Sequence, residues 1–542
     1  MALSLSPASR DTLKNLLICA SLGNLFCSRQ WYQLSFQARE YDYYRDAPLN
    51  PTLLAAIFIS ILVLASVFAA GWYWVRTNPS GWRLRLGETV FLLAAIYPME
   101  SVRRHWNASR FDLGANIVLA IIETTLAVGC FLALAGNDHI VRVAKRAVFS
   151  VSILIPIFLI DFGSPFLAVD RASFETRPSA KPLAPPRPRR VLWILFDELD
   201  QRIAFDRRPA SVRLPELDRL LAASFSASEA RQTQSATLLA IPSLFSSRLV
   251  ASAETIDART LHIGEAGGKQ DVNWREQPNI FTRARAIGAN SAIAGWYHPY
   301  CRIFGDQLVD CFSVGANGLL PDMVVSKQTV ARTVEYILRS VIRVAGEMFV
   351  SGDDSQALKF RTDAVQRLQQ KEYFMIHKRA LADAADPRLN LIFVHYPIPH
   401  PLGIYDRQRR DFSISGSIGY LDNLELVDRS LGELRKKVES AGLAELTTIL
   451  ITGDHGLRPR EWRNLPGWNQ ELRDLTAAGA SPLVPFIVNF PGSAGRAAYD
   501  RPFSTAVTGD LALAILAGNV SNPAEAAAWL DDHVTENGRA MR

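Results

Sequence analysis

Long apolar runs are confined to the first third of the chain, and shorter apolar stretches alternate with polar ones in the rest. A helix that crosses a bilayer needs about 20 mostly apolar residues with few charges. Five runs approach this length: Leu13–Phe26, Leu53–Val75, Gly87–Met99, Ala115–Leu134 and Val148–Ile160. The second and fourth meet the requirement well, whereas the first carries Lys14, the third is short and contains Glu88, and the fifth is of borderline length. We therefore predict a multi-span α-helical membrane domain with five spans, with four as the alternative.

Basic residues beside these runs indicate the orientation of the chain, because positive charge is enriched in cytoplasmic loops. Three groups would then be cytoplasmic: Arg10 with Lys14, Arg76 with Arg83 and Arg85, and Arg142 with Lys145 and Arg146. A fourth group would lie outside against this tendency: Arg103, Arg104 and Arg110. Five spans with a cytoplasmic N-terminus place everything after about residue 165 outside the cytoplasm. We predict a multi-pass protein of the bacterial inner membrane with a periplasmic soluble part.

A proline- and arginine-rich stretch separates this part from the remainder of the chain. Arg177–Arg190 is too rich in proline for a helix and suits an extended spacer, although its basic residues could also contact anionic lipid. We predict a transmembrane domain over 1–168, a linker over 169–190 and a catalytic domain over 191–542. The tyrosine-rich Trp31–Tyr44 is expected at the membrane interface, as an amphipathic segment or an aromatic belt. The net charge of +6, without a basic face studded with aromatic residues, does not indicate nucleic-acid binding.

Beyond residue 190, short strand patterns alternate with helical ones, as is typical of a sheet covered by helices on both faces. The predicted strands are Val191–Phe196, Ser291–Trp296, Leu389–His395, Thr447–Thr452 and Pro485–Phe490. The predicted helices are Arg213–Ser224, Ile280–Ile287, Tyr420–Ser440 and Thr508–Leu516. We expect an α/β fold, arranged as an α/β/α sandwich.

Polar residues follow three of the predicted strands, namely Asp197, His400 and Asp454. Ligands of open α/β sheets gather beyond the carboxyl ends of strands, so these distant segments are expected to converge on one edge. Each has a structural explanation when taken alone. Asp197 with Glu198 could cap a turn, and Asp454-His455-Gly could be a turn with an exposed histidine. Their order along the chain is what favours a site.

The five cysteines divide by their surroundings. Those in or beside apolar runs are expected to act as small hydrophobic residues: Cys19, Cys27 and Cys130. Cys301 and Cys311 lie close together in the soluble part, and in an oxidising compartment a local disulfide is favoured over free thiols. Metal ligation by this pair with His298 is the remaining alternative, which no Cys-x-x-Cys spacing supports.

The ordered set of motifs resembles the sulfatase-like branch of the alkaline phosphatase superfamily, over about residues 190–495. Asp197-Glu198 stands where sulfatases carry paired acidic metal ligands, and Leu214–Leu221 resembles the family's Thr-Pro-Asn-Leu-Asp-Arg-Leu helix. The segment Ser235-Ala-Thr237-Leu-Leu-Ala-Ile-Pro242 is similar to the nucleophile segment of phosphoethanolamine and phosphoglycerol transferases, whose nucleophilic threonine stands five residues before proline. The resemblance therefore assigns the nucleophile to Thr237. The Cys/Ser-x-Pro-x-Arg segment of sulfatases proper is absent from this place in the sequence.

Two histidine motifs bear on the likeness: one matches the transferases and the other departs from them. His395-Tyr-Pro-Ile-Pro-His400 matches a pair whose second histidine serves the metal or the substrate phosphate in those transferases. After Asp454-His455-Gly they usually carry another histidine, whereas Arg458, Arg460 and Arg463 fill the interval here. These arginines could neutralise phosphate or be ordinary surface charges. The resemblance also makes His395, His298, Arg458 and Arg460 candidates for contact with substrate.

The resemblance implies a membrane-bound, metal-dependent phosphotransferase with a phospho-threonine intermediate. Asp197 or Glu198, with Asp454 and His455, would hold a divalent metal ion, zinc or manganese ahead of calcium or magnesium, and Thr237 would complete its ligands. The donor would be a membrane phospholipid carrying phosphoethanolamine or phosphoglycerol, and the acceptor an envelope glycan or lipid. His400 would steady the phosphate or protonate the leaving oxygen.

Two other functional classes use the same sequence. A sulfatase-like hydrolase or phosphodiesterase would employ the same residues with water as the acceptor. A non-catalytic, membrane-anchored glycan-binding or assembly protein would retain only the fold, and the intact Asp197, Thr237, Asp454 and His455 argue against it.

Overall fold

The computed structural model divides into two compact units that are not contiguous in sequence. The first unit comprises Met1–Ala38, Pro48–Val169 and Val325–Ala357, and the second comprises Arg39–Ala47, Asp170–Val324 and Leu358–Arg542. The structure describes residues 7–27, 30–31, 42–46, 51–77, 81–106, 138–149, 174–176, 179–183, 188–265, 271–316, 329–349, 355–414, 417–463, 465, 467–492 and 495–534.

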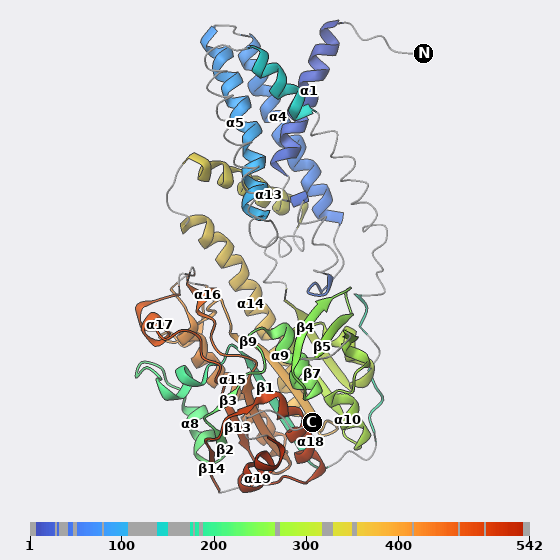
Figure 1. Ribbon diagram of the computed structural model, residues 1–542, viewed down its shortest axis with the longest axis vertical. Coiled ribbons are helices and arrows are strands. Elements are labelled where there is room, and N and C mark those ends of the chain that lie inside the picture. Colours follow the sequence, from blue (N-terminus) through green and yellow to red (C-terminus); the bar gives the residue numbers. More distant parts are fainter. Residues whose placement is uncertain are drawn as a thin grey trace. The chain divides into compact units, whose positions relative to one another are not determined.

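The first unit is helical (Figure 1). Its helices are α1 (Pro7–Phe26), α4 (Pro51–Thr77), α5 (Gly81–Trp106), a helix over 138–149 and α13 (Val330–Phe349). Within the described ranges, only Leu54–Thr77 is long and apolar enough to cross a membrane, with a mean hydropathy of 2.5.

The prediction of five spans is therefore not confirmed. The second apolar run is the apolar part of α4, whereas the first and third runs lie in α1 and α5, which carry charges such as Lys14 and Glu88. These charges lower the hydropathy of α1 and α5 below that of a spanning helix. The run Ala115–Leu134 and most of Val148–Ile160 lie outside the described residues.

The second unit is built on an eight-stranded sheet of order β14-β2-β13-β12-β1-β9-β7-β8 (Figure 1). Its strands are β1 (Arg190–Asp197), β2 (Phe225–Ala227), β7 (Ser291–Tyr297), β8 (Asp310–Gly315), β9 (Leu391–Pro399), β12 (Thr447–Gly453), β13 (Phe486–Asn489) and β14 (Ala497–Tyr499). β12, β1, β9, β7 and β8 run parallel, and β13 is antiparallel to β12 and to β2. All five predicted strands are present in this sheet. A separate small sheet contains β4 (Val250–Thr255), β5 (Leu261–Glu265) and β6 (Val272–Asn273).

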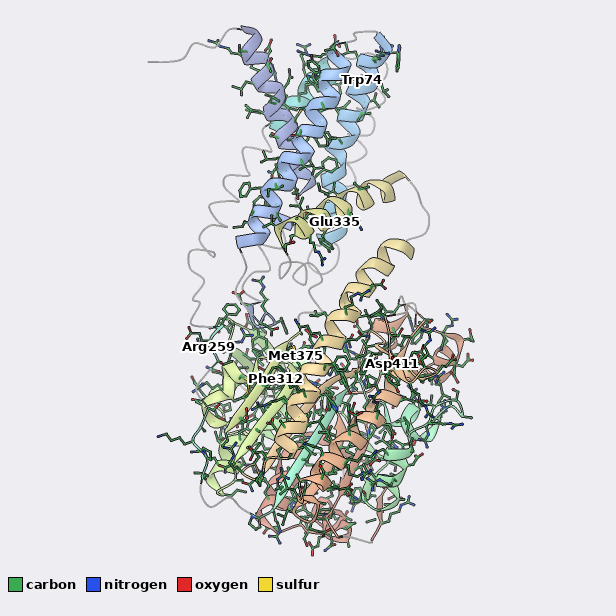
Figure 2. All side chains as sticks on the ribbon, turned by 180° about the vertical axis from the view of Figure 1, so that it is seen from behind. Trp74, Arg259, Phe312, Glu335, Met375 and Asp411 are labelled. Carbon is green, nitrogen blue, oxygen red and sulfur yellow. A yellow bond between two sulfur atoms is a disulfide. The ribbon has the colours of Figure 1, made fainter. Side chains whose placement is uncertain are left out.

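Helices cover both faces of the main sheet, and each face has its own apolar core. β1 shows this division, because Val191, Trp193 and Leu195 pack into one core while Leu192, Ile194 and Phe196 pack into the other. The first core receives side chains of α9 (Thr237–Ser246), α10 (Ile280–Ala286), α18 (Thr508–Ala517) and α19 (Pro523–His533). The second receives those of α8 (Pro215–Ala222), α14 (Ser355–Ala384) and α15 (Tyr420–Ser440). The view from behind shows α14, marked by Met375, lying across the sheet (Figure 2). A strand buried on both faces reads as a continuous apolar run, which is why β1 was recognisable in the sequence.

The parallel strands bring the predicted site residues to one edge of the sheet. β1 pairs with β12 on one side and with β9 on the other, with Phe196 opposite Gly453 and Leu195 opposite His395. Asp197 and Asp454 therefore leave neighbouring strands at the same level. The expected convergence beyond the carboxyl ends is a consequence of this strand order.

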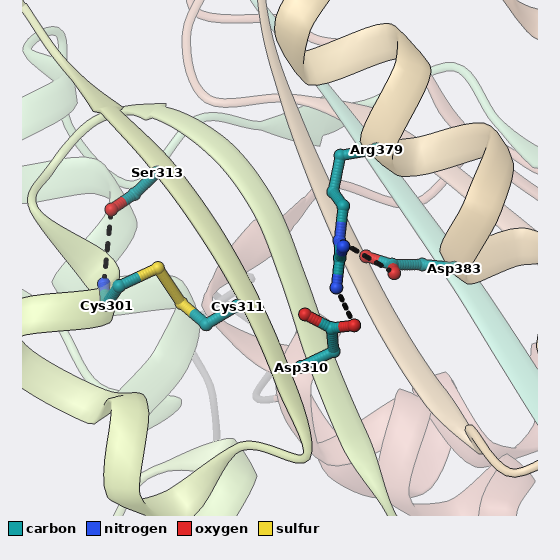
Figure 3. The surroundings of a disulfide bond; sticks show 6 residues. All are labelled: Cys301, Asp310, Cys311, Ser313, Arg379 and Asp383. Carbon is teal, nitrogen blue, oxygen red and sulfur yellow. Dashed lines mark hydrogen bonds and ion pairs between the residues drawn. A yellow bond between two sulfur atoms is a disulfide. The ribbon is translucent and has the colours of Figure 1, made fainter. Parts of the chain in front are cut away.

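Cys301 and Cys311 form a disulfide that ties α11 (Tyr300–Phe304) to the edge strand β8 (Figure 3). The main-chain N–H of Cys301 also donates to Ser313 Oγ on β8, at 3.2 Å. On the same strand Asp310 pairs with Arg379 of α14, which also pairs with Asp383. This edge of the sheet is thus linked both to the preceding helix α11 and to α14.

Candidate active site

Two buried carboxylates lie at the centre of the site. Asp197 ends β1 and Asp454 follows β12, and both side chains are fully buried. Asp454 Oδ1 accepts hydrogen bonds from the main-chain N–H groups of His455 and Glu198, at 2.8 and 3.1 Å. These two bonds fix the Asp454 carboxylate and leave its second oxygen directed into the site.

His455 presents an acceptor nitrogen to the same point. Its Nδ1 lies 3.0 Å from the carbonyl oxygen of Gly456. Because a carbonyl oxygen can only accept, Nδ1 carries the proton and Nε2 keeps a free lone pair. Nε2 lies 3.3 Å from Asp454 Oδ2 and 3.7 Å from Asp197 Oδ1. A histidine that binds a metal through one ring nitrogen typically donates from the other, as Nδ1 does here to Gly456.

Thr237 places its hydroxyl against this group from the opposite segment of the chain. It is the first residue of α9, and its Oγ1 lies 3.3 Å from His455 Nε2 and 3.4 Å from Asp197 Oδ2. The positive end of the helix dipole at the start of α9 favours negative charge at this position. Pro242 lies inside α9, where its missing N–H leaves the carbonyl of Leu238 without the usual helical donor.

The residues present fit a divalent cation. Ligand atoms of Asp197, Asp454 and His455 all lie within 4.8 Å of one another, and the three side chains are buried. Asp197 Oδ1, Asp454 Oδ2 and His395 Nε2 are buried without a hydrogen-bond partner. Several acceptors gathered in a buried place are costly unless a cation satisfies them. The donor set of carboxylate oxygen and imidazole nitrogen suits zinc or manganese.

The pKa values of the two carboxyl groups diverge. Burial, followed by the charge of Asp454, raises the pKa of Asp197 well above its usual range. Burial also acts to raise the pKa of Asp454, but the neighbouring His455 and His395 outweigh it, so that this pKa lies below its ordinary value. Two close carboxyl groups cannot both ionise easily without a cation, which accounts for the split.

His395 joins this group more closely than the sequence indicated. Its Nε2 lies 3.9 Å from Asp197 Oδ2, and its Nδ1 lies 2.9 Å from the hydroxyl of Tyr300. Burial lowers the pKa of His395 to about 4, so the ring is neutral near neutral pH. Among the residues singled out from the sequence, His395 was considered only for substrate contact, whereas its unpartnered nitrogen is directed at the carboxylates.

His400 lies nearby in a different protonation state from the one expected of a proton donor. Its Nδ1 lies 2.7 Å from the carbonyl oxygen of Pro401, so Nδ1 carries the proton and Nε2 is an acceptor. Burial, and then the charge of Arg458, lower the pKa of His400 to about 3. A neutral ring with an acceptor Nε2 is better suited to contact a cation than to protonate the leaving oxygen, which was one of the two roles predicted from the sequence.

Glu198 points away from the carboxylate group. It has a positive φ of 67°, and its carboxylate accepts from Arg458 Nε at 2.7 Å and from Trp462 Nε1 at 2.9 Å. Of the two acidic residues considered as ligands, Asp197 therefore lies in the ligand group and Glu198 holds Arg458. Arg458 is partly exposed, whereas Arg460 and Arg463 are exposed residues of the following turn.

His298 lies behind the nucleophile candidate. Its Nε2 is 3.3 Å from the main-chain oxygen of Thr237, and its Nδ1 is 2.7 Å from the hydroxyl of Tyr43. Tyr43 is fully buried in the second unit, so the expectation that Trp31–Tyr44 lies at a membrane interface is wrong for this residue. Tyrosines that precede an apolar run are typical of an interfacial belt, so nothing in the sequence around Tyr43 indicated its contact with His298.

Comparison with known proteins gives one family match. The model of the type I phosphodiesterase/nucleotide pyrophosphatase family matches residues 251–491. No curated protein matches the chain in sequence.

Several solved structures are similar over about three fifths of the chain. The phosphonate monoester hydrolase SpPMH from Silicibacter pomeroyi is 14% identical, covers 61% of this chain and 73% of its own, and has a TM-score of 0.38. The PsFucS1 sulfatase from Pseudoalteromonas sp. is 14% identical, with 65% and 73% covered and a TM-score of 0.40. The lipoteichoic acid synthase LtaP from Listeria monocytogenes is 10% identical, with 63% and 75% covered and a TM-score of 0.33.

The family match includes Asp454 and His455 of the ligand group, and the motifs of the sequence had indicated the same superfamily. Over residues 251–491 the chain is similar to the type I phosphodiesterase/nucleotide pyrophosphatase family.

Proposed function

We propose that this protein is a phosphotransferase that moves a phosphoethanolamine or phosphoglycerol head group from a membrane phospholipid to an envelope glycan or lipid. The observation that carries the proposal is the position of Thr237 Oγ1, at the first turn of α9 and 3.3 Å from His455 Nε2. A hydroxyl at a helix N-terminus, beside a buried group of unpartnered acceptors, is suited to act as a nucleophile on phosphorus.

The chemistry follows from the residues of the site. A divalent ion held by Asp197, Asp454 and His455, with His395 beside them, would supply positive charge for the threonine oxygen and the phosphate. Thr237 loses its proton towards Asp197 Oδ2, which lies 3.4 Å away, and its oxygen attacks phosphorus. The new bond joins Thr237 Oγ1 to phosphorus, and the bond from phosphorus to the diacylglycerol oxygen breaks, with that oxygen taking up the proton that Thr237 gave to Asp197.

The second half of the reaction regenerates the enzyme. An acceptor hydroxyl attacks phosphorus and gives up its proton, the bond to Thr237 Oγ1 breaks, and that proton restores the threonine hydroxyl. The N–H groups of the first turn of α9 would bind the phosphate oxygens, and Arg458, fixed by Glu198, would add positive charge at the partly exposed side.

Two observations support the cellular setting of the proposal. α4 contains an apolar segment long enough to cross a membrane, so a lipid donor would be close at hand. The disulfide between Cys301 and Cys311 is typical of a compartment outside the reducing cytoplasm. We therefore propose a protein of the bacterial inner membrane with its catalytic unit on the periplasmic side.

A phosphodiesterase is the second candidate, because the family model that matches residues 251–491 describes type I phosphodiesterases and nucleotide pyrophosphatases. In that case water rather than an acceptor hydroxyl would resolve the bond to Thr237. The residues of the first half-reaction would be the same.

The test is intact-mass analysis of the full chain in detergent after incubation with phosphatidylethanolamine or phosphatidylglycerol and zinc or manganese. We expect a head-group phosphate adduct on the wild type and on Ser235→Ala, and none on Thr237→Ala. Ser235 is the matched control, because it is an exposed hydroxyl of the same segment. An adduct that persists in Thr237→Ala would overturn the assignment. Labelled phospholipid incubated with envelope glycan then separates the two candidates, since only a hydrolase releases the head-group phosphate exclusively to water.

A further inference from the structure

A five-residue segment from the N-terminal part of the chain is built into the second unit. Residues 42–46 precede α4 in sequence, yet they belong to the unit that contains the sheet. Arg302, which is buried, donates to the main-chain oxygens of three of them: Asp42 at 3.2 Å, Tyr43 at 2.8 Å and Arg45 at 2.8 Å. A single guanidinium bound to three carbonyl groups fixes the path of this backbone.

The edge of the sheet holds the same segment from a second direction. The N–H of Gly315, at the end of β8, donates to Asp46 Oδ1 at 2.6 Å. A Cβ added to Gly315 would overlap the main-chain oxygen of Tyr44, so the segment lies directly on the glycine backbone. Such close approach of two backbones requires a residue without a side chain.

The segment carries Tyr43 to the rear of the nucleophile candidate. The hydroxyl of Tyr43 lies 2.7 Å from His298 Nδ1, and His298 Nε2 lies 3.3 Å from the main-chain oxygen of Thr237. Since a carbonyl oxygen only accepts, Nε2 must carry the ring proton, and Nδ1 must accept from Tyr43. The hydrogen bonds therefore run in one direction, from the tyrosine hydroxyl through the imidazole to the threonine carbonyl. Burial lowers the pKa of His298 to about 3, which keeps the ring neutral, as this chain of bonds requires.

We propose that Tyr43 is a positioning residue for the nucleophile: its hydroxyl selects the tautomer of His298, and His298 in turn holds the main chain of Thr237 at the site. The proposal rests on the proposed role of Thr237. It extends the active site to a residue that lies far upstream of the sheet, in the segment leading to α4.

Loss of the Tyr43 hydroxyl should disturb Thr237 because each ring nitrogen of His298 needs a matching hydrogen-bond partner. Without the Tyr43 hydroxyl, Nδ1 of the buried His298 has no donor, and its lone pair remains unsatisfied. A proton moved to Nδ1 would leave Nε2 as an acceptor facing the carbonyl oxygen of Thr237, and two acceptors repel. The ring or the first turn of α9 must then shift, and a nucleophile displaced by a fraction of an ångström reacts more slowly.

The test compares Tyr43→Phe with Tyr396→Phe in the full chain. Tyr396 is a matched control, because its hydroxyl also lies 2.7 Å from a histidine Nδ1, that of His377, and it packs into the core on the opposite face of the sheet. Turnover of bis(p-nitrophenyl) phosphate is measured with zinc or manganese, together with metal content and melting temperature. We expect kcat of Tyr43→Phe to fall about tenfold with KM and metal content unchanged, and kcat of Tyr396→Phe to equal that of the wild type.

Two results would overturn the proposal: kcat of Tyr43→Phe within about twofold of the wild type, or an equal loss in Tyr396→Phe, which would indicate a general effect of a lost buried hydroxyl. If the wild type shows no phosphodiester turnover, the head-group adduct on Thr237 decides the proposed function instead. In that case ¹⁵N NMR of the histidine rings decides, with the His298 signal assigned by its loss in His298→Gln. A protonated Nε2 that is lost in Tyr43→Phe supports the positioning role, and an unchanged tautomer refutes it.

Discussion

Replacing Asp454 with asparagine should remove most of the stabilisation that a metal ion gives the protein. Asp454 Oδ1 accepts from two main-chain N–H groups, and the asparagine oxygen can retain both bonds. The new amide nitrogen would occupy the position of Oδ2, which has no partner and faces His455 Nε2 and the Asp197 carboxylate. In the metal-free protein the variant loses an ionised carboxylate whose pKa the fold lowers, so it should be no more stable than the wild type there. Asp454→Asn should also weaken metal binding.

The charges of the site decide the size of the effect with and without metal. Two unit negative charges 4.8 Å apart, the upper limit for the ligand atoms of Asp197 and Asp454, repel by roughly 3 kcal/mol at an effective dielectric constant of about 20. Without metal this repulsion is relieved by proton uptake at Asp197, whose pKa is raised, while Asp454, whose pKa is lowered, keeps its charge, so the variant gains nothing from removing that charge. A metal present at about 100 times its dissociation constant stabilises the wild type by about 2.7 kcal/mol, a gain that the variant should largely lose.

The assay is thermal unfolding of the full chain in detergent, followed by tryptophan fluorescence, with EDTA or with excess zinc or manganese. In EDTA the variant should melt at or below the temperature of the wild type, and with metal the difference should widen. A variant that gains as much from metal as the wild type would refute the assignment of Asp454 as a ligand. Ser235→Ala serves as the control, since this exposed residue should leave both melting temperatures unchanged.

Three further changes test other parts of the second unit. Burial raises the pKa of Asp383 from 3.8 to about 7, so the contribution of the protonated carboxyl to stability is full below its ordinary pKa and is lost as the pH rises through about 7. The resulting fall in melting temperature between these pH values should be smaller in Asp383→Asn. An equal fall in the variant would contradict burial of Asp383 as its cause. Removing the disulfide with Cys301→Ser and Cys311→Ser should lower the free energy of unfolding by about 3 kcal/mol, as expected for a sequence separation of 10. The measurement is urea unfolding of the variant and of the oxidised wild type. A loss below about 1 kcal/mol would argue against a stabilising disulfide. Trp462→Phe removes a donor from the buried Glu198 carboxylate and should cost about 1–3 kcal/mol in the same measurement, whereas no cost would mean that water replaces the indole.

Much of the fold was predictable because the local pattern of apolar and polar residues shows which side chains are buried. β1 is apolar at nearly every position, as a strand buried on both faces must be, and the helix predicted over Tyr420–Ser440 has those bounds in the structure. The membrane part was less predictable. Apolar runs in α1 and α5 lie in helices that also carry charges, and only α4 among the described helices has the composition of a span.

The members of the site were identified from motifs, but their roles depended on geometry. Glu198 follows Asp197 directly, yet a positive φ sends its side chain to Arg458 and Trp462. His395 and His400 belong to one short motif. Only the structure shows that His395 Nε2 faces Asp197 and that His400 Nδ1 lies against a carbonyl oxygen, which leaves His400 Nε2 as an acceptor.

The sequence by itself determined the chemical groups available: Asp197, Thr237, Asp454 and His455 at the ends or starts of recognisable elements. It could do so because strand, helix and turn preferences act over a few residues. The tertiary structure alone decided that β12 and β9 flank β1, that His395 faces the carboxylates, and that Tyr43 lies behind Thr237. Those relations join residues far apart in the chain, and which donor meets which acceptor is settled only when the whole unit packs.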